Sequence, residues 1–149
     1  MEYKVTTHNI SETIELAQNF ESEKFPNMII CLNGDMGSGK TLFTKGIAQA
    51  LGIKENITSP TFTIIKEYEG ELPLYHMDVD RLNGNTDGTG IEEYFTKGGV
   101  VVIEWADSIK DILPKERLEV SIKVVGENTR VFYFKPIGQQ YEDLCEAVL

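Results

Sequence analysis

The chain has 149 residues, of which 41% are hydrophobic, and these values suit a single soluble domain over residues 1–149. Its formal net charge of −10 argues against tight direct binding to nucleic acid, because such binding needs many Lys and Arg side chains. The sequence has no signal peptide and no apolar run long enough to cross a bilayer, so we expect a cytoplasmic protein without membrane contacts.

A helix over residues 12–23 is the first predicted element, with Ser11 placed to cap it and apolar side chains at helical spacing. Pro26 and Asn27 end that segment. Residues 28–32 then form a short apolar run rich in branched side chains, which is typical of a strand buried on both faces.

Residues 34–41 read Gly-Asp-Met-Gly-Ser-Gly-Lys-Thr and fit G-x-x-x-x-G-K-[ST], the phosphate-binding P-loop. The glycines let the backbone curl so that its N–H groups point at a phosphate. Lys40 supplies a positive charge for the outer phosphates, and Thr41 offers a hydroxyl to Mg²⁺. The predicted nucleotide-binding residues of the loop are Gly34, Met36, Gly37, Ser38, Gly39, Lys40 and Thr41.

The residues after the loop predict a helix that Gly52 can close, because Leu42, Phe43 and Ile47 recur at helical spacing. The helix N-terminus adds its dipole and free N–H groups to the anion site. A chance match in a Gly-rich turn would not carry this order of strand, loop and helix.

A loop at residues 57–60 precedes a strand-like segment at residues 61–68. Thr61 lies where the γ-phosphate is expected, and the segment around it can act as a switch that senses the triphosphate. The alternative is an ordinary Pro-containing turn, which the spacing alone favours.

Residues 74–79 predict another strand, with His76 and Asp78 at its end and Arg81 just beyond. Asp78 can orient the attacking water or a Mg²⁺-bound water, and Arg81 can offset phosphate charge. The alternative is structural, with His76 and Arg81 in hydrogen bonds and Asp78 capping a turn. Spacing does not decide between the two.

A surface loop at residues 83–90 and a short helix at residues 91–95 lead to a second buried strand at residues 100–103, which runs into Glu104. We interpret Glu104 as a Mg²⁺ ligand, directly or through water. The alternative is a solvent-exposed glutamate at a strand end. Trp105, the only tryptophan, either walls the site, binds a partner or simply packs.

The C-terminal third predicts a helical segment at residues 106–113, strands at residues 118–125 and 130–134 around a hairpin, and a closing helix at residues 140–148. The fold class is therefore α/β: a P-loop NTPase-like three-layer sandwich, with a mostly parallel sheet and an antiparallel edge hairpin. The ligand is expected at the carboxyl ends of the parallel strands.

Four elements in this order resemble the bacterial TsaE (YjeE) family. They are the P-loop, Ser-Pro-Thr-Phe at residues 59–62, His-Met-Asp at residues 76–78 and Glu-Trp at residues 104–105. The P-loop alone is common to many families, whereas the other three in this order are much more specific. The family commonly has a tyrosine where this chain has Asp80, so no role is assigned to that position.

The resemblance implies a small ATPase needed to make threonylcarbamoyladenosine in tRNAs that read codons starting with A. Such proteins work with TsaB and with TsaD, which transfers the threonylcarbamoyl group from its adenylate, so tRNA is reached only through the complex. The resemblance also implies that Thr41 and Glu104 hold Mg²⁺, that Lys40 holds the phosphates of ATP, and that Asp78 and Trp105 are needed for hydrolysis or for the complex. The hairpin near Gly126 would lie close to the adenine.

Two alternatives to an ATPase remain at this point, a small-molecule phosphotransferase and a nucleotide-gated binding protein without turnover. A phosphotransferase usually has a lid with several arginines, whereas this chain has only Arg81, Arg117 and Arg130. The same scarcity predicts slow hydrolysis by the chain alone. The lack of an Asn-Lys-x-Asp motif favours ATP over GTP.

Overall fold

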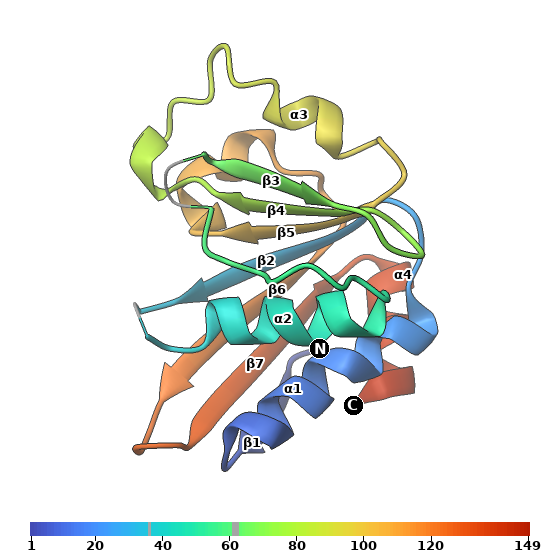
Figure 1. The fold of residues 1–149 in the computed structure, drawn as a ribbon, viewed down its shortest axis with the longest axis vertical. Helices are drawn as coiled ribbons and strands as arrows, with labels where there is room; N and C mark the ends of the chain where they lie inside the picture. Colours follow the sequence, from blue (N-terminus) through green and yellow to red (C-terminus); the bar gives the residue numbers. More distant parts are fainter. Residues whose placement is uncertain (36, 61–62) are drawn as a thin grey trace.

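The computed structural model describes residues 1–35, 37–60 and 63–149, with the backbone alone for Glu21, and within these residues seven strands form one sheet (Figure 1). The strand order is β1-β7-β6-β2-β5-β4-β3. The strands are β1 (Tyr3–Thr7), β2 (Met28–Gly34), β3 (Ile65–Tyr68), β4 (Leu74–Asp78), β5 (Val100–Glu104), β6 (Arg117–Val124) and β7 (Arg130–Ile137).

The centre of the sheet is parallel and both of its sides are antiparallel. Strands β6, β2, β5 and β4 pair in parallel. The β6–β7 hairpin is antiparallel as predicted, but it does not form the edge because β1 pairs with β7 outside it. On the other side, β3 pairs with β4 in the antiparallel sense. The parallel strands therefore end together at one edge, which is where an α/β sheet binds its ligands.

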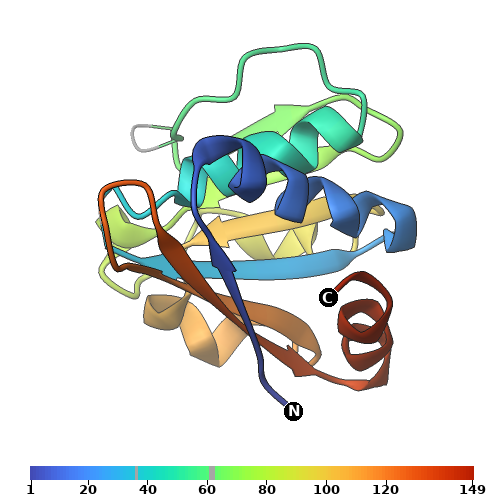
Figure 2. The same cartoon turned by 90° about the horizontal axis from the view of Figure 1, so that it is seen from below.

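Helices cover both faces of the sheet, which confirms the predicted three-layer α/β fold (Figures 1 and 2). On one face lie α1 (Ile10–Gln18), α2 (Lys40–Ala50) and α4 (Gln139–Val148), and on the other lie α3 (Ile91–Tyr94) and the 3₁₀ segment η3 (Ala106–Ile112). The two remaining 3₁₀ segments of the described chain are η1 (Asn19–Glu23) and η2 (Asp80–Leu82). No helix of the described residues is long and apolar enough to span a membrane.

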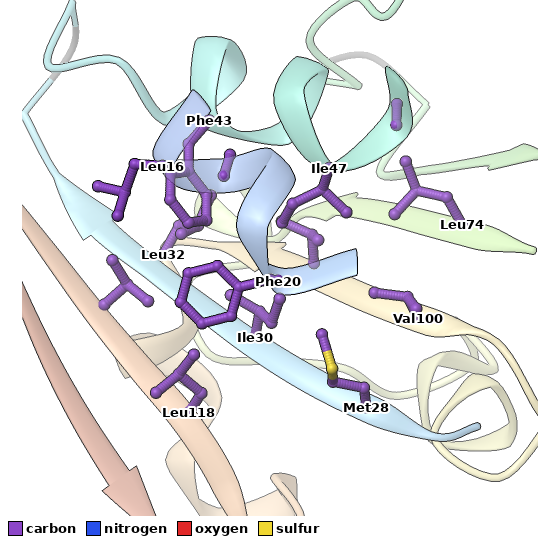
Figure 3. Packing of buried hydrophobic residues seen from close by; sticks show 14 of the residues in the cluster. Leu16, Phe20, Met28, Ile30, Leu32, Phe43, Ile47, Leu74, Val100 and Leu118 are labelled. Carbon is purple, nitrogen blue, oxygen red and sulfur yellow. The ribbon is translucent and has the colours of Figure 1, made fainter. Parts of the chain in front are cut away.

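The larger core lies between α1, α2 and the central strands (Figure 3). Phe20 and Phe43 meet edge to face, with ring centroids 6.0 Å apart, above Ile30 and Leu32 of β2. The continuous apolar run of β2 is buried because helices pack on both of its faces, as a central parallel strand requires. The loop that follows β2 thus leaves a rigid scaffold.

Two predicted elements begin at other residues than expected. The first helix begins at Ile10 rather than Glu12, because Asn9 and not Ser11 caps it, and its last five residues tighten into 3₁₀ geometry. The helical segment predicted at residues 106–113 is present as η3, which has 3₁₀ geometry and ends at Ile112. β3 starts at Ile65, since Ile64 has a φ of +68° and donates its N–H to the Pro60 carbonyl at 2.8 Å. Thr61 and Phe62 lie outside the described residues.

Candidate nucleotide and magnesium site

The P-loop connects β2 to α2, as predicted. Gly37 and Gly39 have φ values of +80° and +110°, a left-handed backbone that favours glycine. A Cβ at Gly34 would lie 2.6 Å from Ser38 Oγ and 3.0 Å from the Ile122 carbonyl oxygen. These three glycines are therefore required by the path of the loop. Met36, predicted to bind nucleotide, lies outside the described residues, as does Thr61.

One cavity of about 420 Å³ brings most of the predicted residues together. Asp78 and Glu104 are register partners at the ends of the parallel pair β4–β5, so both carboxylates reach the same edge of the sheet. Trp105 follows Glu104, and α2 contributes its first turn. The lining residues are Gly37, Gly39, Lys40, Thr41, Leu42, Ser59, Asp78, Glu104 and Trp105.

Lys40 is a buried cation held by two contacts. Its ammonium donates a hydrogen bond to the Gly34 carbonyl at 2.8 Å and lies 3.6 Å from the centroid of the Trp105 ring. Burial lowers the pKa of Lys40 below its ordinary value, and the nearby carboxylates, Glu104 first, oppose that shift. The site thus holds a desolvated positive charge where phosphate oxygens would accept hydrogen bonds.

Glu104 is only 4% exposed, so the alternative of a solvent-exposed glutamate is wrong. Its Oε2 lies 2.6 Å from Nε2 of His76, which is fully buried. Asp78 is also buried, and its Oδ1 accepts a hydrogen bond from the Asp80 backbone at 3.1 Å. Both carboxylates are therefore held in place before any ligand arrives.

Trp105 adopts a left-handed backbone, with a φ of +64°. For a bulky side chain such a conformation costs on the order of 1–3 kcal/mol, and it persists only where the surroundings impose it. Here the Trp105 N–H donates to the Leu32 carbonyl at 3.1 Å, and the ring lies over Lys40. Of its three predicted roles, the structure favours a wall of the site.

A second, smaller cavity of about 190 Å³ adjoins the P-loop on the side of the β6–β7 hairpin. Arg130 links the hairpin to the P-loop, because its Nε donates a hydrogen bond to the Ser38 carbonyl at 3.1 Å. The sequence did not indicate this role, since the contact joins residues 92 positions apart. The cavity is lined by Asn9, Ile10, Thr13, Gly37, Gly39, Leu42, Asn128 and Arg130.

The side chains of this site can hold Mg²⁺ only if a bound nucleotide supplies further ligands. No group of three or more His, Cys, Asp or Glu side chains in the described chain is arranged to hold a metal on its own. Thr41 and Glu104 instead line the same cavity, as expected for an ion that keeps water and phosphate oxygen as its other ligands. Ser38 Oγ is buried without a partner among the described residues, so the loop still has a hydroxyl for a phosphate.

Comparisons with known proteins all point to one family. The family model "Threonylcarbamoyl adenosine biosynthesis protein TsaE" matches residues 7–132. A Bacillus subtilis protein named "tRNA threonylcarbamoyladenosine biosynthesis protein TsaE" is 47% identical over 97% of this chain and 92% of its own. A Treponema pallidum protein of the same name is 43% identical over 68% of this chain and 77% of its own. The crystal structure of Bacillus YdiB superposes with a TM-score of 0.88 at 44% identity, covering 99% and 94% of the two chains.

Proposed function

Because the chain belongs to the TsaE family, we propose that it is a Mg²⁺-dependent ATPase that supports threonylcarbamoyladenosine formation in tRNA together with TsaB and TsaD, in the cytoplasm. The observation that carries the ATPase proposal is the single cavity in which Lys40, Thr41, Asp78 and Glu104 meet. Such a set serves phosphoryl transfer, where catalysis is mostly positioning and charge stabilisation.

Lys40 and the loop N–H groups bind the outer phosphates. To do so, the Lys40 ammonium exchanges the Gly34 carbonyl for phosphate oxygens, which replaces a neutral acceptor by a charged one. Thr41 and Glu104 hold Mg²⁺, which when bound offsets the charge that develops on the transferred phosphoryl group. The first turn of α2 adds its N–H groups to the same phosphates.

Asp78 positions the attacking water. Its carboxylate is fixed by the Asp80 N–H and lies beside Glu104 at the edge of the sheet. A carboxylate oxygen held in this way can accept a proton from a water aligned with the γ-phosphate. Trp105 closes the wall of the cavity next to Lys40 and limits the entry of bulk water.

The smaller cavity gives the base a place next to the phosphates. It shares Gly37, Gly39 and Leu42 with the larger one, so a nucleotide can occupy both. This position beside the hairpin agrees with the expectation that the hairpin near Gly126 lies close to the adenine. The absence of a guanine-selective motif from the sequence supports ATP.

Hydrolysis by the chain alone should be slow, because no arginine is among the described residues that line the larger cavity. Arg117 pairs with Glu119, and Arg130 is bound to the Ser38 carbonyl. Without an arginine at the γ-phosphate in addition to Lys40, the transition-state charge is poorly offset. A partner protein can supply or order what is missing.

A reconstituted modification assay tests the proposed function. TsaB, TsaD, the threonylcarbamoyl adenylate and tRNA would be combined with wild-type protein, Lys40→Ala or Glu104→Ala, and the modified tRNA counted per TsaD. Wild type should support multiple turnovers, and both variants should not. Lys54→Ala and Glu55→Ala, which change exposed residues outside the cavity, serve as matched controls. Equal yields with Lys40→Ala and wild type would contradict the proposal.

A further inference from the structure

His76 is a polar side chain in an apolar layer. It lies on β4 between Leu74 and Asp78 on the same face of the strand, and its register partner on β5 is Val102. Leu74 and Val102 are both fully buried. A leucine or valine would fill this position without any cost of desolvation, so the imidazole needs an explanation.

Among the described residues, the imidazole has one polar contact. Its Nε2 lies 2.6 Å from Glu104 Oε2, and since an ionised carboxylate only accepts, Nε2 carries the proton of this bond. The other ring nitrogen, Nδ1, is buried and has no partner among the described residues. A structural histidine normally satisfies both nitrogens, because a buried polar atom without a hydrogen bond destabilises the folded protein.

The two carboxylate oxygens of Glu104 have different surroundings. The backbone places Glu104 opposite Asp78 at the strand end, whereas His76 lies two residues further back along β4. The bond to His76 occupies Oε2 and limits rotation of the carboxylate. Glu104 and Thr41 both line the cavity, and the bond to His76 does not occupy Oε1. Carboxylates that ligate metals are commonly oriented by such a hydrogen bond.

We propose that His76 is a positioning residue that orients Glu104 so that one of its oxygens is presented to the Mg²⁺ of a bound nucleotide. This inference rests on the proposed function of Glu104 as a Mg²⁺ ligand. His76 is not among the described residues that line the cavity, so its effect passes through the carboxylate of Glu104. Loss of such an orienting partner typically costs about 10- to 100-fold in metal affinity.

Calorimetry can isolate this effect without measuring turnover. A nonhydrolysable ATP analogue would be titrated into each variant with excess Mg²⁺ and with EDTA, and the ratio of the two affinities reports what Mg²⁺ contributes. His76→Leu should bind the analogue like wild type in EDTA, while the ratio falls about 10-fold or more, toward that of Glu104→Gln. His76→Gln, whose amide N–H can reach Glu104, should recover most of the ratio.

Controls separate positioning from packing. Met77→Leu changes the neighbouring buried position of β4, which faces the other core cluster, and should leave the ratio unchanged. If His76→Leu does not fold, His76→Asn replaces it, because the shorter amide keeps polarity without reaching Glu104. One outcome would overturn the role of His76 and leave that of Glu104 intact. In it, the folded His76 variant keeps the wild-type ratio of affinities with Mg²⁺ and with EDTA, while the ratio falls in Glu104→Gln. A wild-type ratio in Glu104→Gln overturns the metal assignment of Glu104 and this inference with it.

Discussion

Burial of the Lys40 ammonium, which serves binding in the proposed function, destabilises the folded protein. The folded protein buries its ammonium, which lowers the pKa of Lys40 below 10.5, the ordinary value that it has in the unfolded chain. The Lys40 side chain therefore binds its proton more tightly in the unfolded chain than in the folded protein. The penalty to folding is present at neutral pH and disappears as the pH rises through the folded-state pKa toward 10.5.

Lys40→Met should therefore raise the melting temperature of the nucleotide-free protein at neutral pH and remove its stabilisation by Mg²⁺ and ATP. The advantage of the variant should shrink as the pH approaches 10.5, where the wild-type side chain also becomes neutral. Thermal unfolding at several pH values, with and without nucleotide, measures both effects. A variant that melts below wild type at neutral pH would show that the contacts of Lys40 with Gly34 and Trp105 outweigh burial.

Local sequence was enough to predict some residues of the site and not others. Lys40 and Thr41 follow from a motif of eight consecutive positions, and Glu104 follows from an apolar run that ends in a carboxylate. By contrast, the left-handed backbone of Trp105 and the bond between His76 and Glu104 depend on contacts between strands. No spacing rule along a single segment carries that information.

Among the elements, the first helix offers a direct test of which residue caps it. Asn9 has an extended backbone, and its side chain accepts the Glu12 N–H at 2.8 Å. Asn9→Ala should destabilise the protein by about 1 kcal/mol. Ser11→Ala, the matched control, should have little effect because Ser11 lies inside the helix. Urea unfolding measures both, and an equal cost for Ser11→Ala would contradict this assignment.

Gly46 of α2 lets the helices α1 and α2 approach each other closely. A Cβ at Gly46 would lie 2.6 Å from Ala17 Cβ and 2.8 Å from the Ile14 carbonyl oxygen. Alanine normally stabilises a helix relative to glycine by about 1 kcal/mol, but overpacking here costs about 1–3 kcal/mol. Gly46→Ala should therefore destabilise the protein in urea unfolding.

Ala17→Gly provides the partner for a double-mutant cycle with Gly46→Ala. Removing the Ala17 Cβ relieves the closest contact of the new methyl group, so the double variant should lose less stability than the sum of the single variants. The contact with the Ile14 carbonyl remains, which makes the rescue partial. Additive losses would mean that the helices move apart instead.

Element types were easier to predict than their ends and their pairing. β2 and β5 are continuous apolar runs, so their identity as buried strands follows from composition. β1 was missed because Tyr3–Thr7 is a short edge strand that exists only by pairing with β7, more than 120 residues away. At the opposite edge β3 pairs with β4 in the antiparallel sense, so the sheet is antiparallel at both edges and not only at the predicted one.

For the whole molecule, the net charge of −10 disfavours direct binding of this protein to the tRNA of the proposed pathway. Binding to tRNA gains its free energy mainly from counterion release by basic side chains, and a strongly acidic protein cannot supply that gain. The chain alone should bind labelled tRNA more weakly than about 10⁻⁴ M at physiological salt, as fluorescence anisotropy would measure. Saturable, salt-dependent binding by the chain alone would contradict this expectation.

The rate of phosphate release from ATP, measured for the chain alone and with TsaB and TsaD, tests the central claim most directly. We predict slow Mg²⁺-dependent release by the chain alone, a faster rate with both partners, and no release by Glu104→Ala in either condition. Glu55→Ala, an exposed glutamate outside the cavity, should behave like wild type. No release above background with the partners present would contradict the claim and leave a protein that binds ATP without turning it over.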